Sequence, residues 1–168
     1  SESVGRLRDA GYRYFKFDFN HVRGGRLHNP KLTRVQAMHH LFALLRRAAG
    51  EDSYVLACVG NAERSVVGLV DAVRIGSDSL AHWAPNPMAD GLPRDPMNLS
   101  ECSRTAAQSA LANGVLYACD PDVTYTLPRN DLTWEELRTF HSYVGLLGGL
   151  AMVSEPLNLP AYAGDEAL

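Results

Sequence analysis

The sequence of 168 residues has little cysteine, no long hydrophobic run and no excess of basic residues. Its three cysteines, Cys58, Cys102 and Cys119, are too few and too scattered to build a disulfide framework or a structural zinc site. No apolar run approaches the roughly 20 residues of a membrane-spanning helix. The 16 basic and 19 acidic residues are interspersed, so we expect neither a nucleic-acid nor a membrane partner.

The chain does have an ordinary globular composition, with 46% hydrophobic and 21% charged residues, which is enough for one hydrophobic core. The amino-terminal Ser1-Glu-Ser3 is polar, with neither a starting methionine nor a signal-peptide pattern. Together with the scarcity of cysteine, this favours a cytoplasmic location, and secretion is the alternative if a leader has been removed. We expect no cofactor and no metal ion; the paired His39 and His40, for example, lack a carboxylate to complete a metal triad.

Five short strand-like segments alternate with helical ones along the chain. Apolar and aromatic runs predict strands over residues 14–20, 54–59, 71–75, 115–119 and 150–153. Helical spacing and terminal residues predict helices over 3–10, 30–49, 98–112 and 133–144, with a short helix or turn over 62–69. Short connections between apolar strands are typical of parallel βαβ units, so the predicted fold class is α/β.

The segment 14–20 is the most informative strand, because it alternates aromatic and polar residues. Its three phenylalanines share one face, and Lys16 and Asp18 share the other with Tyr14 and Asn20, since successive side chains of a strand point to opposite sides. A lysine and an aspartate inside a sheet are costly unless they are paired or solvated. In a barrel this cost is avoided when the polar face of the strand lines the lumen near its open end. The alternative is a buried lysine–aspartate pair whose two charges only neutralise each other.

Other polar residues also follow the predicted strand ends, among them Asp78, Asp120 and Glu155. This is the edge where barrels and open α/β sheets place their active sites. Two carboxylates such as Asp18 and Asp78 can flank a scissile bond, and retaining glycosidases hold such a pair about 5–5.5 Å apart, one as nucleophile and one as general acid/base. Lys16 points the same way as Asp18 and would keep that carboxyl ionised.

These segments resemble the α-galactosidase (melibiase) group, clan D of the glycoside hydrolases. Residues 11–20 (GYRYFKFDFN) are similar to the fourth barrel strand of that family, which carries Lys-x-Asp with the nucleophile at the aspartate. Residues 71–78 are similar to the sixth strand, whose closing aspartate is the acid/base. The spacing of Cys58 and Arg64 is similar to the Cys-x-x-Gly-Gly-x-Arg loop after the fifth strand, although other residues replace its two glycines.

The later segments resemble the same family in the same order. Residues 119–122 (CDPD) are similar to the Asn-Asp-Pro-Asp after the seventh strand. Residues 132–138 and 148–156 look like the seventh helix and the eighth strand, with Glu155 where the family often has Ser-Asp. The resemblance implies a partial (β/α)8 TIM barrel of about five parallel strands, the fourth to the eighth. Residues 1–168 would then be the C-terminal portion of a catalytic domain whose first strands and flanking β-domains have no counterpart here.

The family resemblance also implies a function. The chain would belong to a retaining hydrolase of terminal α-linked galactosides, with Asp18 as nucleophile and Asp78 as acid/base of a double displacement. Its carbohydrate-binding residues would be Lys16, Asn20, Cys58, Arg64, Arg74, Trp83 and Asp120. Three of them have structural interpretations as well: Cys58 as a small buried side chain, Trp83 as packing for its loop, and Asp120 as part of a turn.

Two other functions fit the same residues. A galactosyl transglycosylase of the raffinose- or stachyose-synthase kind would use the site with a sugar in place of water. A non-catalytic carbohydrate-binding fragment would bind sugar without turnover. An isolated piece of a barrel has unpaired strand edges, which invite association. We therefore expect the remaining barrel strands to come from the same or another chain, and the protein to form a homo-oligomer.

Overall fold

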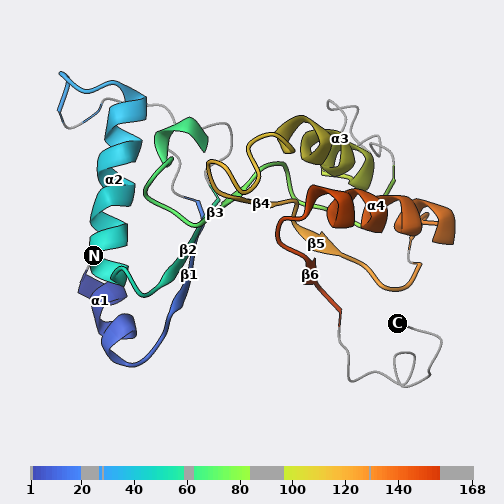
Figure 1. The fold of residues 1–168 in the computed structure, drawn as a ribbon, viewed down its shortest axis with the longest axis horizontal. Coiled ribbons are helices and arrows are strands. Elements are labelled where there is room, and N and C mark those ends of the chain that lie inside the picture. Colours follow the sequence, from blue (N-terminus) through green and yellow to red (C-terminus); the bar gives the residue numbers. More distant parts are fainter. Residues whose placement is uncertain are drawn as a thin grey trace, which may run out of the picture. The chain divides into compact units, whose positions relative to one another are not determined.

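The computed structural model describes residues 2–19, 27, 29–58, 63–83, 97–128 and 130–155 (Figure 1). The chain forms two units. Unit 1 comprises Ser1–Ile75 and Gly114–Cys119, and unit 2 comprises Gly76–Asn113 and Asp120–Leu168. No helix within these described ranges is long and apolar enough to cross a membrane.

Unit 1 is built on a sheet of parallel strands. Its elements are α1 (Glu2–Asp9), β1 (Tyr14–Phe17), α2 (Arg34–Ala49), β2 (Tyr54–Ala57), the 3₁₀ helix η1 (Glu63–Ser65) and β3 (Ala72–Arg74). The strands β1, β2 and β3 form a four-stranded sheet with β4 (Ala118–Asp120), in the order β1-β2-β3-β4. Parallel pairing joins β1 to β2 and β2 to β3, with Tyr14 opposite Tyr54 and Leu56 opposite Ala72. The predicted α/β fold with parallel strands is confirmed.

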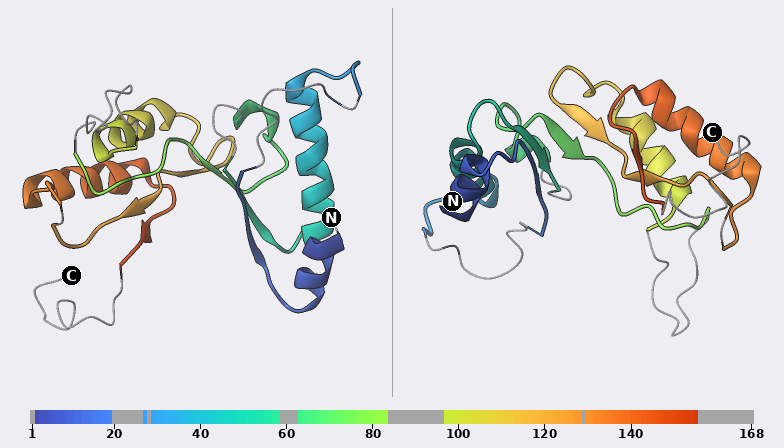
Figure 2. Two further views of the ribbon diagram at one scale, coloured as in Figure 1. Left: turned by 180° about the vertical axis from the view of Figure 1, so that it is seen from behind. Right: turned by 90° about the horizontal axis from the view of Figure 1, so that it is seen from below.

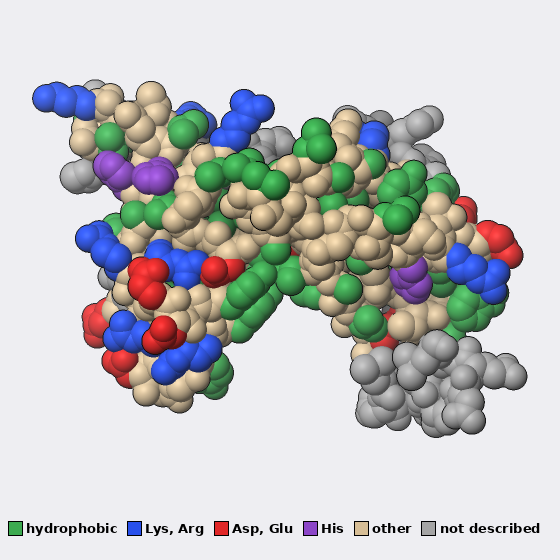
Figure 3. Space-filling view, in the orientation of Figure 1, with side chains coloured by type: hydrophobic (Ala, Val, Ile, Leu, Met, Phe, Trp, Pro, Cys, Tyr) green, Lys and Arg blue, Asp and Glu red, His purple; other side chains and the backbone are tan. Residues whose placement is uncertain are grey.

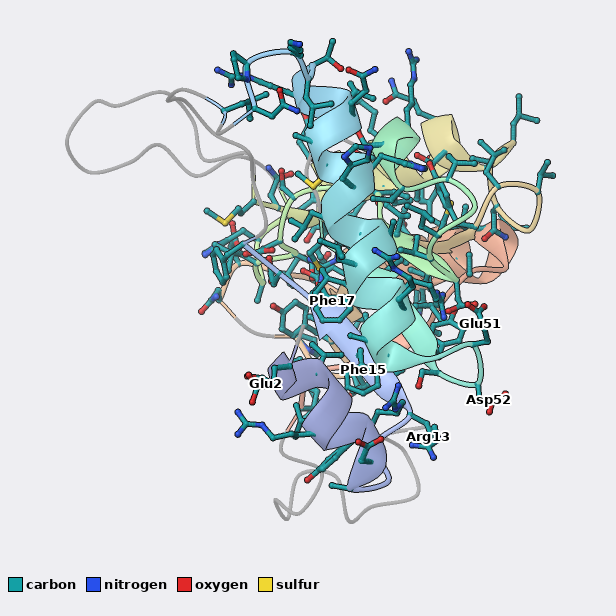
Figure 4. The ribbon with its side chains drawn as sticks, turned by 90° about the vertical axis from the view of Figure 1, so that its left-hand side faces the viewer. Glu2, Arg13, Phe15, Phe17, Glu51 and Asp52 are labelled. Carbon is teal, nitrogen blue, oxygen red and sulfur yellow. The ribbon has the colours of Figure 1, made fainter. Side chains whose placement is uncertain are left out.

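One face of this sheet packs against α2 and forms the core of unit 1. Phe15, Val55 and Val73 contribute from three neighbouring strands to a buried cluster that also contains Phe42 of α2. The ring of Phe17 meets Phe42 edge-on, with ring centroids 6.2 Å apart. Figure 4 shows Phe15 and Phe17 along β1, beside α2. Two of the three phenylalanines in segment 14–20 therefore lie on the buried face, as the alternation predicts.

The third phenylalanine departs from that prediction. Phe19 is 87% exposed and has a φ of 55°, so the chain has left the strand geometry by this point. Its N–H donates to Oδ1 of Asp18 over 2.7 Å, a local bond that replaces the sheet ladder. The prediction that the aromatic face extends to Phe19 is wrong, because β1 ends at Phe17.

The helix α2 begins later than the proline at position 30 predicts. Pro30 lies in a turn, and the helix starts at Arg34 after the N-cap residue Thr33. Thr33 and Gln36 form a capping box, in which each side-chain oxygen accepts the backbone N–H of the other residue over 3.2 and 2.9 Å. Gly50 ends the helix, as predicted, with a φ of 86°.

Charged side chains of both signs gather over α1 and the C-terminal end of α2 (Figure 3). At this end the guanidinium of Arg46 donates three hydrogen bonds, to the carbonyl oxygens of Leu69 and Ser53 and to Oδ2 of Asp71, over 2.8, 2.7 and 2.5 Å. An open pocket of about 580 Å³ lies beside it. These contacts tie α2 to the start of β3, at the edge of the sheet where the strands begin.

Unit 2 places two capped helices beside a short strand pair. Its elements are α3 (Leu99–Ser109), β5 (Val123–Thr124), α4 (Trp134–Leu147) and β6 (Met152–Val153), and β5 pairs with β6 in parallel. The helices α3 and α4 lie side by side in Figures 1 and 2, and α4 contacts β5. The predicted capping box of Thr133 and Glu136 is confirmed at the start of α4. Leu132 and Leu137, on either side of this cap, are both buried in the core of unit 2.

Strand boundaries near the end of the chain differ from the prediction. The strand predicted over 115–119 begins only at Ala118, and the sequence pattern does not predict β5. Pro121 lacks a backbone N–H, and Asp122 has a φ of 75°, so the chain turns before it becomes extended again. The strand predicted over 150–153 is shortened to β6.

Replacing Phe42 with alanine is expected to lower the free energy of unfolding by about 3–5 kcal/mol, because it empties a fully buried position in the core of unit 1. Urea denaturation measures the change. Val35→Ala is the matched control, since Val35 lies on the same helix but is 59% exposed, and it should change stability by only about 0.5 kcal/mol. Equal losses from both variants would contradict the packing of α2 on the sheet.

Candidate active site

Three predicted site residues form one row at the C-terminal edge of the unit 1 sheet. The register of the two parallel pairings, continued by one residue, sets Asp18 opposite Cys58 and Cys58 opposite Arg74. The Cys58 N–H donates to the Phe17 carbonyl over 2.8 Å, which extends the ladder to this level. Neighbouring strands are about 4.8 Å apart, so the backbones of Asp18 and Arg74 are about 10 Å apart along the edge.

The residues just before them, Phe17, Ala57 and Val73, pack in the core on the α2 side. Because successive side chains of a strand point to opposite faces, the side chains of the row lie on the face opposite α2. Cys58 and Arg74 are each 6% exposed, whereas Asp18 is exposed. A guanidinium keeps its charge under all physiological conditions. The row therefore combines an accessible carboxylate with a buried, permanent positive charge, two strands apart on one face.

Lys16 lies on the same face as Asp18, two residues earlier and opposite Leu56. Its side chain is exposed. In this chain both side chains reach solvent, on the face that the α2 core leaves uncovered, and the alternative of a buried lysine–aspartate pair in a completed barrel stays open. Nearer the start of these strands, the rings of Tyr14 and Tyr54 stack with centroids 5.7 Å apart.

Asp78 belongs to unit 2 and is exposed. The residue that follows it is fixed by hydrogen bonds from each of its polar groups. The Ser79 N–H donates to Oδ2 of Asp122, and its hydroxyl donates to the carbonyl of Val123, both over 2.7 Å. The Ser79 carbonyl accepts the hydroxyl of Tyr125, also over 2.7 Å. The separation between the carboxyl groups of Asp18 and Asp78 stays a prediction.

The Asp-Pro-Asp segment forms a turn. Asp120 is fully buried, and its Oδ1 accepts the N–H of Asp122 over 2.8 Å. Asp122 adopts a left-handed backbone conformation with a φ of 75°, which costs a residue other than glycine roughly 1–2 kcal/mol. The hydrogen bond from Asp120 helps to hold this conformation. The contacts therefore support the turn-forming interpretation of Asp120, and sugar binding by Asp120 stays a prediction.

Of the other predicted residues, Arg64 and Trp83 lie outside the row. Asn20 lies outside the described residues. Arg64 is exposed in η1. Trp83 is half-buried against the core cluster of unit 2, and its carbonyl accepts the N–H of Ser100 over 3.1 Å. These contacts support the interpretation in which Trp83 packs its loop, and its stacking on a sugar ring stays a prediction.

Sequence reasoning missed two contacts near the ends of β5 and β6. Tyr125 is 9% exposed and holds Ser79, as described above. Glu155 accepts the N–H of Thr126 on Oε1 over 3.2 Å, which ties the end of β6 to the end of β5. The signal for β5 is the run of β-prone residues 123–126 (VTYT), which follows directly on the Asp-Pro-Asp turn. No cluster of three or more metal-binding side chains occurs in the part of the chain that the structure describes.

The chain is similar in fold to α-galactosidases of known structure. It matches the α-galactosidase TtGalA from Thermus thermophilus, solved in complex with stachyose, with 28% identity and a TM-score of 0.66 over 97% of this chain and 35% of that one. No family model matches the chain. The similarity confirms the resemblance to clan D α-galactosidases predicted from the sequence.

Two more distant structures share the fold alone. The α-galactosidase of Saccharomyces cerevisiae is 15% identical, with a TM-score of 0.69 over 95% of this chain and 37% of that one. α-Galactosidase I from Mortierella vinacea is 12% identical, with a TM-score of 0.70 over 95% and 42%. The chain therefore spans between about a third and two fifths of the length of these enzymes.

Proposed function

We propose that this chain is the C-terminal portion of the TIM-barrel catalytic domain of a retaining glycoside hydrolase that acts on terminal α-linked galactosides. The observation that carries the proposal is the row of Asp18, Cys58 and Arg74 at the strand ends of a parallel sheet, in a chain 28% identical to an α-galactosidase over 97% of its length. The carboxyl ends of barrel strands are where such enzymes build their active sites. The other barrel strands would be supplied by the same or another chain.

The proposed reaction is a double displacement. In the first step a carboxylate oxygen of Asp18 attacks the anomeric carbon, the bond from that carbon to the leaving oxygen breaks, and Asp78 gives its proton to the leaving oxygen. In the second step Asp78 takes a proton from water, the water oxygen attacks the same carbon, and the bond to Asp18 breaks. Two inversions at one carbon give net retention. The reaction requires the two carboxyl groups to lie about 5–5.5 Å apart.

The other residues of the row have roles that their surroundings support. Asp18 is exposed at the strand end, so a substrate carbon can reach its carboxylate. Arg74 is a buried, permanent cation on the same face, and with Lys16 it would donate hydrogen bonds to sugar hydroxyls. Cys58 lies between Asp18 and Arg74 and would line the floor of the sugar site. Asn20, Arg64, Trp83 and Asp120 complete the proposed set of sugar-binding residues.

Product analysis tests the proposal. The complete protein is incubated with stachyose, and the products are followed by ¹H NMR and chromatography. Free galactose, released first as the α-anomer, is the expected result, since retention preserves the configuration of the substrate. Galactose moved onto another sugar would instead identify a transglycosylase. Binding of stachyose without turnover would overturn the hydrolase proposal in favour of a non-catalytic carbohydrate-binding protein.

A further inference from the structure

Ser79, which directly follows the exposed Asp78, is buried and held by several hydrogen bonds. All three hydrogen-bonding groups of Ser79 are engaged by the segment 122–125, as described above. On the other side of Asp78, the carbonyl of Ser77 accepts the thiol of Cys102 over 3.5 Å. The backbone is therefore fixed on both sides of a carboxylate that is itself exposed.

The groups that hold this peptide are buried. Ser79 is 3% exposed, Asp122 is 6% exposed and Tyr125 is 9% exposed. Hydrogen bonds among buried groups are not in competition with water, and breaking one leaves an unsatisfied partner. Asp122 takes part from a left-handed conformation, which persists only where neighbouring contacts hold it. The network is therefore a rigid support and not an incidental surface contact.

We propose that Tyr125 and Asp122 are positioning residues for Asp78. Asp122 holds the Ser79 N–H, which belongs to the peptide joining Asp78 to Ser79, and Tyr125 holds the Ser79 carbonyl on the far side of the same residue, so that together they fix the backbone next to Asp78. The inference rests on the proposed function, in which Asp78 is the general acid/base. It goes beyond that function by assigning a role to a tyrosine and an aspartate that would not touch the substrate.

The chemistry explains why such a support matters. A general acid works only when its proton lies within hydrogen-bond reach of the leaving oxygen, about 2.6–3.2 Å between heavy atoms. A displacement of about 1 Å at a catalytic group can cost roughly 100-fold in rate. Proton donation matters most for a poor leaving group, since an activated aryl group departs with little help. Loosening the support should therefore slow the two kinds of substrate unequally.

Tyr125→Phe tests this inference, because it removes one hydroxyl and keeps the buried ring. On methyl α-galactoside we expect kcat to fall about tenfold or more, with KM within about twofold. On p-nitrophenyl α-galactoside we expect the rate of the initial nitrophenol burst, which reports the first step alone, to fall less than about threefold. Tyr143→Phe is the matched control, because Tyr143 lies on α4 and is 40% exposed, and it should leave both substrates unchanged.

A second measurement follows the support without using activity. Hydrogen exchange at the Ser79 N–H should speed up about tenfold or more in Asp122→Ala, and Asp122→Asn should restore slow exchange because it keeps an acceptor oxygen. Unchanged exchange in Asp122→Ala, or equal losses in the rate of the first step on both substrates in Tyr125→Phe, would overturn the positioning role alone. A wild-type protein that hydrolyses neither substrate would instead overturn the proposed function on which it rests.

Discussion

Replacing Asp18 with asparagine is expected to reduce kcat on α-galactosides by about 1,000-fold or more, since it removes the nucleophile of the proposed reaction. The amide cannot form the covalent galactosyl intermediate, although it has nearly the same shape as the carboxylate. Its carbonyl oxygen can still accept the Phe19 N–H that Oδ1 of Asp18 accepts now. The exposed position predicts little change in stability, so the loss should appear in initial rates and not in the thermal midpoint.

The control for this variant is another exposed aspartate in unit 1. Asp52 lies in the turn before β2, at the edge of the sheet where the strands begin (Figure 4). Asp52→Asn changes the net charge by the same amount and should leave kcat unchanged. Turnover by Asp18→Asn at a rate near that of the wild type would show that the nucleophile has been assigned wrongly.

Replacing Asp78 with alanine should separate substrates by their leaving group. On methyl α-galactoside the loss in kcat should reach about 100- to 10,000-fold, because the departing alkoxide needs a proton. On p-nitrophenyl α-galactoside formation of the galactosyl intermediate should be almost unaffected, and the size of the burst of nitrophenol should show it. Steady-state and rapid-mixing kinetics on the two substrates measure both effects.

The control for Asp78→Ala is Glu135→Ala, which removes an exposed carboxylate from the first turn of α4 in the same unit. It should leave the ratio of the two rates as in the wild type. If Asp78→Ala slows formation of the galactosyl intermediate from both substrates by the same factor, Asp78 does not act as the acid, and the loss would have to come from binding or folding.

Much of the fold follows from local chemistry in the sequence. The alternation at Phe15 and Phe17 predicts the buried face of β1, and the pairing of Thr133 with Glu136 predicts the start of α4. Both signals act over a few residues, so tertiary contacts do not have to be known. The alternation predicts that the strand continues to Asn20, whereas β1 ends at Phe17 and leaves Asp18 directly after the strand.

Other features depend on contacts between residues far apart in the chain. Tyr125 holds Ser79 across 46 positions, and no local pattern indicates that bond. The exposure of Phe19 follows from a backbone turn that a strand pattern cannot predict. Pro30 predicts an earlier start for α2 than the one that the capping box of Thr33 and Gln36 sets. Local signals therefore predict the elements, and long-range hydrogen bonds determine how the candidate site is held.

The most direct test of the account is chemical rescue of Asp18→Gly by azide. Removing the side chain leaves space at the strand end, and azide can then attack the anomeric carbon while Asp78 protonates the leaving oxygen. One displacement inverts that carbon, so the account predicts that added azide restores turnover and that NMR identifies the product as β-galactosyl azide. No acceleration by azide and no glycosyl azide, in a variant that still folds and binds the substrate, would contradict the assignment of Asp18 as the nucleophile.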